Sequence, residues 1–180
     1  MLHIVRHPFD VAVSFAHHMG WTVEQAVGHM GSPFRFSSQD YRLSLPFPEP
    51  VGTWSDNVLG WTHLDQPYRC LTVRYEDLLL DSMESFHRIS AFAGFEVTEF
   101  ELQHAVDAAS FDKLQAQETA KGFRERPTTS PQFFRTGKSL SWEGVLSEDL
   151  QRRISRRHTE AMHRFGYCED GTTTPELPLL

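Results

Sequence analysis

The fold of this chain of 180 residues is decided by its opening stretch, MLHIVRHPFDVAVSFAHH, residues 1–18. The apolar run over residues 2–6 predicts a short buried strand that ends on Arg6. Pro8 suits the first position of a helix, and we expect that helix to end near Gly20. Because ligands of open α/β sheets bind at the carboxyl ends of the strands, Arg6 places a cation where an anion can sit.

A second strand is predicted in the middle of the chain, where the run YRCLTVRY occupies residues 68–75. Strands that alternate with helices predict an α/β fold with a parallel sheet. We therefore expect residues 2–6 and 69–75 to be parallel neighbours. In that arrangement Arg6 and Tyr75 lie at the carboxyl ends of the two strands, on one side of the molecule.

Capping residues mark the starts of further helices. The helix that begins after Asp81 carries an apolar stripe, which we expect to be buried. Long loops are expected over residues 31–52 and 121–141, and no ordered structure is expected after Tyr167. The expected caps are Thr22, which forms a capping-box pattern with Gln25, and Asp81, Thr98, Ser110 and Ser147.

The composition bounds the class of protein. A net charge of −7 argues against a broad nucleic-acid surface, although a pocket for a small anion needs only a few cations. No apolar run is long enough to span a membrane, and the first residues lack the pattern of a secretory signal. Two cysteines, Cys70 and Cys168, do not make a disulfide framework. These features predict one cytoplasmic domain that binds neither nucleic acid nor membrane.

Four short stretches carry candidate binding chemistry. Each also has an ordinary structural explanation: an arginine at a strand end is most often a surface cation or the partner of a carboxylate. Likewise, Phe111 can simply belong to the core and Gly137 to an ordinary loop. The stretches are RHPFDVAVS (residues 6–14), VRYEDLL (73–79), ASFDKL (109–114) and FFRTGKSLSW (133–142).

Taken together and in this order, the four stretches resemble the cytosolic-type sulfotransferases, a family that uses 3′-phosphoadenosine 5′-phosphosulfate (PAPS). The resemblance extends from about residue 2 to Tyr167. It implies a P-loop-NTPase-like parallel sheet flanked by helices. It also implies transfer of a sulfuryl group from PAPS to a hydroxyl or amine of a small acceptor. Acceptor choice is expected to fall to residues 31–52 and 121–134.

The resemblance assigns the 3′-phosphate of the cofactor to two residues of the first stretch. In the family, the Arg and the Ser of an Arg-x-Pro-x-Asp-Val-Ala-Val-Ser segment hold that phosphate, which implies the same role for Arg6 and Ser14. Tyr75 matches a tyrosine that contacts the adenine. Ser110 and Phe111 match a Ser-Phe pair whose ring packs against the adenine.

The last stretch is similar to the family's Arg-Lys-Gly loop, which closes over the 3′-phosphate and is followed by an Asp-Trp pair. Its counterparts here are Arg135, Thr136 and Gly137. The family's lysine is therefore a threonine in this chain, and we expect Lys138 to supply the missing charge from a different direction. Ser141 stands where an Asp usually precedes the Trp.

No Gly-rich phosphate cradle occurs in the 180 residues. The family's sulfate-side phosphate loop and its catalytic histidine lie upstream of the part that this chain resembles. We therefore expect residues 1–167 to be the C-terminal portion of a sulfotransferase domain, lacking its N-terminal phosphate-loop portion. Residues 168–180 are expected to be a disordered tail. The exposed edge of such a sheet predicts possible self-association.

No catalytic residue is assigned. His17 and His18 are tempting bases, but we expect one to face the flank of the helix and the other to face solvent. No set of His, Cys and carboxylate residues has metal-ligand spacing, so no metal is expected. Two alternatives stay open. The chain can be a non-catalytic remnant that binds 3′-phosphoadenosine nucleotides, or a half-domain that depends on a partner.

Overall fold

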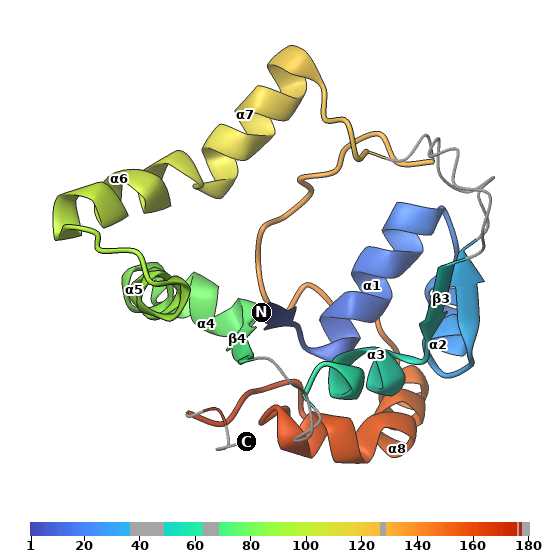
Figure 1. Ribbon diagram of the computed structural model, residues 1–180. Helices are drawn as coiled ribbons and strands as arrows, with labels where there is room; N and C mark the ends of the chain where they lie inside the picture. Colours follow the sequence, from blue (N-terminus) through green and yellow to red (C-terminus); the bar gives the residue numbers. More distant parts are fainter. Residues whose placement is uncertain (37–48, 63–68, 127–128, 176, 178–180) are drawn as a thin grey trace.

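The computed structural model describes residues 1–36, 49–62, 69–126, 129–175 and 177, and Figure 1 shows how they are arranged. In chain order the elements are β1 (Leu2–Val5), α1 (Pro8–Met19), α2 (Val23–Met30), β2 (Phe34–Phe36), β3 (Glu49–Gly52), α3 (Trp54–Gly60), β4 (Leu71–Arg74), α4 (Tyr75–Leu80), α5 (Ser82–Ala93), α6 (Glu99–Ala108), α7 (Phe111–Lys121) and α8 (Glu148–Arg164).

The predicted parallel pair is present. β1 and β4 lie side by side in parallel, with a register that runs from Leu2 opposite Leu71 to Val5 opposite Arg74. Among the described residues this parallel sheet has two strands. Both strands end one residue earlier than predicted: β1 ends at Val5, and β4 ends at Arg74 because Tyr75 already belongs to the first turn of α4. The fold is therefore α/β, with a small parallel sheet and flanking helices.

The predicted loop over residues 31–52 is wrong at its two ends. β2 and β3 form a short antiparallel pair, with an irregularity between Phe34 and Arg35. The middle of that loop, residues 37–48, lies outside the described residues, so its part in acceptor choice stays a prediction.

The caps at the helix starts follow the sequence closely. The Nδ1 atom of His7 accepts the amide of Phe9 and caps α1, which ends at Gly20 with a φ of 68°. The predicted capping box of Thr22 and Gln25 is present at the start of α2. The side chains of Asp81, Thr98 and Ser147 also cap their helices as predicted, whereas Ser110 precedes α7 without a side-chain cap bond.

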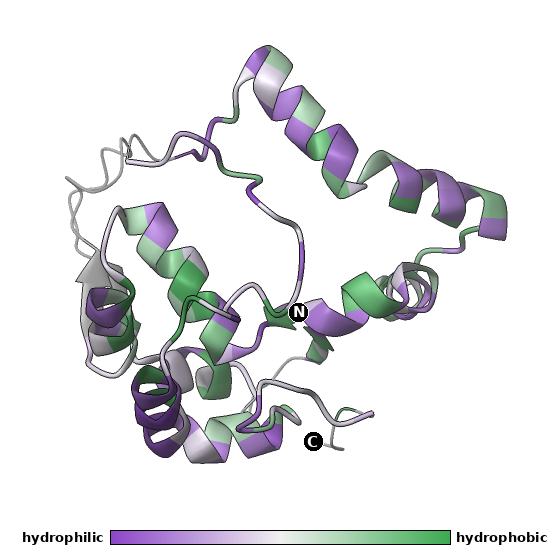
Figure 2. Ribbon diagram, turned by 180° about the vertical axis from the view of Figure 1, so that it is seen from behind, coloured by the Kyte–Doolittle hydropathy of each residue, from purple (hydrophilic) through white to green (hydrophobic). Residues whose placement is uncertain are grey.

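The core lies between β1 and the helices α1, α2, α3 and α8. α1 buries Phe9, Ala12 and Val13 against this core, and α8 contributes Ile154, Ala161 and Met162. The opposite face of α8 is exposed and rich in arginine, and Figure 2 shows hydrophilic residues gathered along this helix. Packing of amphipathic helices on one short strand pair thus fixes the position of Arg6, the residue that follows β1.

Helices α6 and α7 stand apart from this core in Figure 1, and the segment after α7 returns past α1. The expectation that α5 buries its apolar stripe is wrong, since among the described side chains of α5 the buried one is Ser85. β1 also leaves one face open, with Leu2 41% and Ile4 54% exposed. This open apolar face is compatible with self-association, which stays a prediction.

The segment after Tyr167 differs from the expected disordered tail. Tyr167 forms an antiparallel bridge with Thr173, and the amide of Thr174 donates to the carbonyl of Gly166 at 2.7 Å. The buried Arg74 donates to the carbonyl of Thr174 at 2.9 Å. An arginine at the end of β4 therefore holds residues beyond the expected boundary at 167.

Both cysteines, Cys70 and Cys168, are free. Within the described residues, no helix combines the length and the apolar character that crossing a membrane requires.

Candidate functional site

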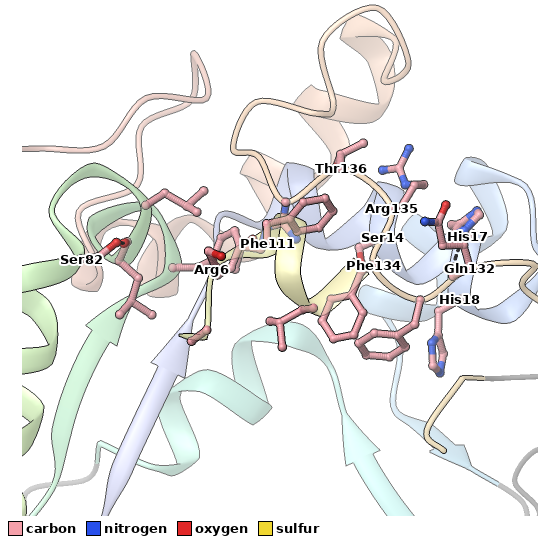
Figure 3. Close-up of a pocket in the computed structure, with 18 of the residues that line it drawn as sticks. Arg6, Ser14, His17, His18, Ser82, Phe111, Gln132, Phe134, Arg135 and Thr136 are labelled. Carbon is pink, nitrogen blue, oxygen red and sulfur yellow. Dashed lines mark hydrogen bonds between the residues drawn. The ribbon is translucent and has the colours of Figure 1, made fainter. Parts of the chain in front are cut away.

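A cavity of about 810 Å³ lies beside the carboxyl ends of β1 and β4 (Figure 3). Its lining comes from α1, from α4 to α7 and from residues 130–137. The volume is in the range that small-molecule and cofactor sites occupy. Every residue that the resemblance assigns to the cofactor lines this one cavity: Arg6, Ser14, Tyr75, Ser110, Phe111, Arg135, Thr136 and Gly137.

Arg6 is held by several contacts at the edge of the cavity. Its Nη2 atom donates to the carbonyl of Lys138 at 2.9 Å and to Ser141 Oγ at 3.4 Å. The same nitrogen lies 3.6 Å from a carboxylate oxygen of Asp10. The guanidinium also stacks on the ring of Tyr75. Among the described residues the buried Nε atom of Arg6 has no hydrogen-bond partner, which leaves donor capacity at this point of the site.

Ser14 and Arg135 reach the cavity from two other segments. Ser14 is exposed and lies on α1 about 9 Å beyond Pro8 along the helix axis, given the rise of an α-helix. Arg135 lies on the segment that returns from α7, more than a hundred residues further along the chain (Figure 3). A cation and a hydroxyl from distant segments are thus brought to the cavity that Arg6 lines.

Phe111 and Gly137 are in close contact. Gly137 has a φ of +59°, and a Cβ atom added there would lie 2.1 Å from Cδ2 of Phe111. The ring of Phe111 also meets Phe134 edge-on, with 6.4 Å between the ring centroids. Glycine at 137 therefore allows the backbone of this segment to lie directly against the Phe111 ring.

The segment is fixed to α7 by a residue that sequence reasoning missed. The two carboxylate oxygens of Glu118 accept the amides of Phe133 at 2.7 Å and Phe134 at 2.9 Å. Gln115 adds a hydrogen bond from its side-chain amide to the carbonyl of Phe134 at 2.8 Å. These partners lie 15 to 19 residues apart in the chain, so no local pattern points to them.

A second missed group lies behind Arg6 and Tyr75. Glu76 accepts the amide of His7 at 2.9 Å and the hydroxyl of Tyr167 at 3.2 Å. His7 also places its Nε2 atom 3.1 Å from the carbonyl of Cys168. Burial raises the pKa of Glu76 and lowers the pKa of His7 to about 4. This group connects the ends of both strands to the C-terminal segment.

Lys138, which we expected to supply the missing lysine charge, lies differently from Thr136, which takes the lysine's place in the motif. Thr136 lines the cavity, whereas the exposed Lys138 is not among the lining residues and meets Arg6 through its backbone carbonyl.

Both His17 and His18 are half-buried and line the cavity, so the expectation that one of them faces solvent is wrong. The Nε2 atom of His17 lies 3.0 Å from Ser130 Oγ. Burial, together with the neighbouring His17, lowers the pKa of His18.

Within the part of the chain that the structure describes, no cluster of three or more His, Cys, Asp or Glu residues could hold a metal ion. The chemistry that the cavity offers is recognition of an anion and of a flat ring. The cations are Arg6, directly after β1, and Arg135; Ser14 on α1 supplies a hydroxyl, and the ring of Phe111 supplies the flat surface.

The fold has known relatives. A mouse sulfotransferase, SULT7A1, crystallised with PAP (3′-phosphoadenosine 5′-phosphate), superposes with a TM-score of 0.67 at 22% sequence identity. The superposition covers 89% of this chain and 57% of that chain. The chain therefore has the α/β fold of a sulfotransferase.

The sequence comparisons agree. The chain is 24% identical over 178 residues to flavonol 3-sulfotransferase from Flaveria bidentis, which covers 92% of this chain and 55% of that protein. It is 29% identical over 166 residues to cytosolic sulfotransferase 16 from Arabidopsis thaliana, covering 86% and 48%. The chain thus spans about half the length of these relatives. The family model of the sulfotransferase domain matches residues 1–166, and the chain belongs to this family.

Proposed function

We propose that this chain is the part of a PAPS-dependent sulfotransferase that holds the 3′-phosphate and the adenine of the cofactor. One observation carries the proposal: Arg6, Ser14 and Arg135, from three separate segments, line one cavity together with Phe111 and Tyr75. The family membership and the PAP in the mouse neighbour's crystals support this choice of ligand.

In the proposal, the 3′-phosphate binds between Arg6, Ser14 and the segment that begins at Arg135. The phosphate is close to a dianion, and a guanidinium offers it a fork of matched donors. Each charge-assisted hydrogen bond is worth about 1.5–3 kcal/mol. Ser14 lies well into α1, so the phosphate lies along the flank of that helix and not at its N-terminal amides. Thr136 supplies a hydroxyl where the family pattern has a lysine.

The adenine packs on the ring of Phe111, and Tyr75 contacts it from α4. Ser110 lies at the start of α7, beside that ring. Gly137 brings the backbone of the closing segment against Phe111, so phosphate and adenine recognition are linked within a few residues. Specificity for PAPS over AMP or ATP then comes from the 3′-phosphate.

The reaction that we propose moves a sulfuryl group from PAPS to a hydroxyl or amine of a small acceptor. The flavonol acceptor in the name of the Flaveria bidentis relative supports a hydroxyl. Sulfuryl transfer needs in-line positioning and cations on the bridging and leaving oxygens. In this proposal, the parallel pair belongs to a larger P-loop-NTPase-like sheet, whose other part supplies those groups. No catalytic residue is proposed in this chain.

The setting that we propose is the cytoplasm, which the name of the Arabidopsis thaliana relative supports. The partner is a small-molecule acceptor, and the net charge of −7 argues against a nucleic-acid partner. The second candidate function is a non-catalytic remnant that binds 3′-phosphoadenosine nucleotides. It is favoured by the sequence, which contains no Gly-rich phosphate cradle.

Calorimetric titration with 3′-phosphoadenosine 5′-phosphate (PAP) and with AMP tests the binding part of the proposal. We expect the chain to bind PAP more tightly than AMP. Arg6→Ala should weaken PAP binding by about 2–3 kcal/mol and leave AMP binding almost unchanged, because AMP lacks the 3′-phosphate.

Arg124→Ala is the matched control, since Arg124 is exposed and does not line the cavity. It removes the same charge and should change neither affinity. Equal losses for PAP and AMP in Arg6→Ala, or an equal loss in Arg124→Ala, would contradict the assignment of Arg6 to the 3′-phosphate.

A further inference from the structure

Asp10 is a buried carboxylate whose hydrogen-bond donors all belong to one distant segment. Its Oδ2 atom accepts the amide of Leu140 at 2.9 Å. Its Oδ1 atom accepts Ser141 Oγ at 2.9 Å and the amide of Trp142 at 3.1 Å. Asp10 lies in the first turn of α1 and is 1% exposed, and these donors lie 130 to 132 residues further along the chain.

The segment that Asp10 holds contains a strained residue. Leu140 has a φ of 59°, and among the described residues it is the only residue other than glycine with a positive φ. A Cβ atom in this conformation crowds the neighbouring carbonyl, so a residue such as leucine adopts it roughly 5- to 30-fold less often than glycine would. The side chain of Leu140 is 41% exposed, so its packing does little to offset the strain. Such a conformation persists where surrounding contacts impose it.

Both ends of this segment are anchored, but its middle depends on Asp10 and Arg6. At one end Glu118 holds Phe134. At the other end Trp142 is buried and meets Phe9 edge-on at 5.2 Å between ring centroids. Between these anchors, Arg6 donates to the carbonyl of Lys138 and lies 3.6 Å from the Asp10 carboxylate.

We propose that Asp10 is a positioning residue that holds residues 138–142 in the strained turn at Leu140 and thereby sets the cofactor segment 135–137 against Arg6 and Phe111. The proposal rests on the proposed function for its ligand. It adds a part that the residues assigned to the cofactor do not supply, because Asp10 contacts the segment and does not line the cavity. Because the side chain of Leu140 is exposed, replacing Leu140 with glycine removes the backbone strain without removing a core side chain.

A simpler role for Asp10 would be electrostatic. An acid beside Arg6 opposes phosphate binding through its charge, so removing the charge alone would strengthen the binding of PAP. A positioning role predicts the opposite sign. Asp10→Asn keeps one neutral acceptor oxygen and turns the other into a donor. Residues 138–142 then lose one acceptor and the charge on the other, so PAP binding weakens.

The first experiment needs no ligand and measures hydrogen–deuterium exchange of the amides of residues 138–142. Asp10→Asn should lower the protection factors of the Leu140 and Trp142 amides by about tenfold or more, since each loses a charge-assisted hydrogen bond. In the double variant Asp10→Asn/Leu140→Gly the turn is no longer strained. The protection factors of the two amides should therefore be at least about threefold higher than in Asp10→Asn alone. Unchanged protection in a folded Asp10→Asn variant would overturn the proposal.

The second experiment measures PAP and AMP affinities of the same variants. We expect Asp10→Asn to weaken PAP about tenfold and AMP less than about twofold, with partial recovery when Leu140→Gly is added. Asp107→Asn is the control, because Asp107 is an exposed acid that lines the cavity and does not contact residues 138–142. Tighter PAP binding in both Asp10→Asn and Asp107→Asn would support the simple charge effect and contradict a positioning role.

Ser141→Ala covers the case in which Asp10→Asn fails to fold. It removes the hydrogen bond to Oδ1 of Asp10 and leaves the carboxylate in place. The same changes in exchange and in PAP affinity are expected, each about threefold, and Leu140→Gly should again reverse part of them. If no variant binds PAP, the proposed function fails, while the exchange experiment still decides whether Asp10 holds the segment.

Discussion

The guanidinium carbon of Arg6 lies 4.5 Å from the centroid of the Tyr75 ring. Arg6 directly follows β1 and Tyr75 directly follows β4, and the last residues of these strands, Val5 and Arg74, are register partners. The parallel pairing therefore brings the cation and the ring together at the carboxyl edge of the sheet, beside the cavity. In the proposed function, this pair is the part of the site that recognises the cofactor.

Tyr75 is expected to act on adenine and Arg6 on the 3′-phosphate, and their variants should separate these roles. Tyr75→Leu removes the ring, so it should weaken PAP and AMP by similar factors, on the order of threefold to tenfold. Tyr75→Phe keeps the ring over Arg6 and should bind both nucleotides almost normally. Calorimetry on the two variants provides the measurement. A loss confined to PAP would assign Tyr75 to the phosphate.

Gly137 is expected to be essential for the Phe111 platform. Gly137→Ala places a methyl group 2.1 Å from Cδ2 of Phe111, so the ring or the segment must move. Gly144→Ala is the matched control, since Gly144 also has a positive φ, of +71°, but has nothing within 4 Å of an added Cβ. The positive φ should cost both variants about 1–2 kcal/mol of unfolding free energy, and Gly137→Ala should lose more because of its contact with Phe111. Gly137→Ala alone should lose PAP and AMP affinity, and an equal loss in Gly144→Ala would point to global destabilisation.

With Thr136 in place of a lysine, the proposed 3′-phosphate site has one cation fewer than the family pattern. Thr136→Lys adds a cation to a residue that lines the cavity and should tighten PAP by about tenfold, with a smaller effect on AMP. The gain should shrink with added salt. Ser139→Lys adds the same charge to a neighbour that is not among the lining residues. Equal gains in both variants, measured by titration at two salt concentrations, would mean that only the general charge matters.

His7 should make the stability of the fold depend on pH. Burial lowers its pKa from 6.5 to about 4, while Asp10 and Asp170 oppose this shift. In the unfolded chain His7 therefore becomes protonated below about pH 6.5, whereas in the folded chain it stays neutral until about pH 4. This contribution to the unfolding free energy is full above pH 6.5 and is lost as the pH falls toward 4. Its size is about 3 kcal/mol.

His7→Asn keeps an acceptor for the Phe9 amide and removes the titration. Denaturant unfolding at about pH 7 and pH 5 should show a smaller loss of stability in this variant than in the wild type. Glu76 acts in the opposite sense, because burial raises its pKa and favours the protonated folded form as the pH falls. An identical pH dependence in wild type and His7→Asn would exclude His7 as its source.

The chain alone should transfer sulfate from PAPS at little or no measurable rate. Its sequence has no Gly-rich phosphate cradle for the sulfate side, and the loss of a single stabilising donor already costs about 10²–10³ in rate. The test is transfer of radiolabelled sulfate to a panel of phenols, alcohols and amines, with the chain as given and with a version extended upstream. Robust turnover by the short form would point to His17 or His18 as the base.

The sequence by itself determined the local features of this protein. The strand before Arg6, the capping box of Thr22 and Gln25, and the motif residues of the cavity all follow from patterns a few residues long. Such patterns act through periodicity, capping hydrogen bonds and motif spacing, which do not depend on the path of the chain. The parallel pairing of the two strands could also be predicted, because both motifs had to face one ligand.

The tertiary structure decided the contacts that join distant segments. The apolar stripe of α5 is only half-buried because α5 lies outside the core that β1, α1, α2, α3 and α8 share. Arg74 binds the carbonyl of Thr174, beyond the expected boundary at 167, and Glu76 binds the hydroxyl of Tyr167 at that boundary. Asp10 stood within a recognised motif, yet its partners lie 130 to 132 residues away. A carboxylate can accept hydrogen bonds from any segment that lies beside it, so its partners follow from the tertiary structure and not from the residues next to it in the sequence.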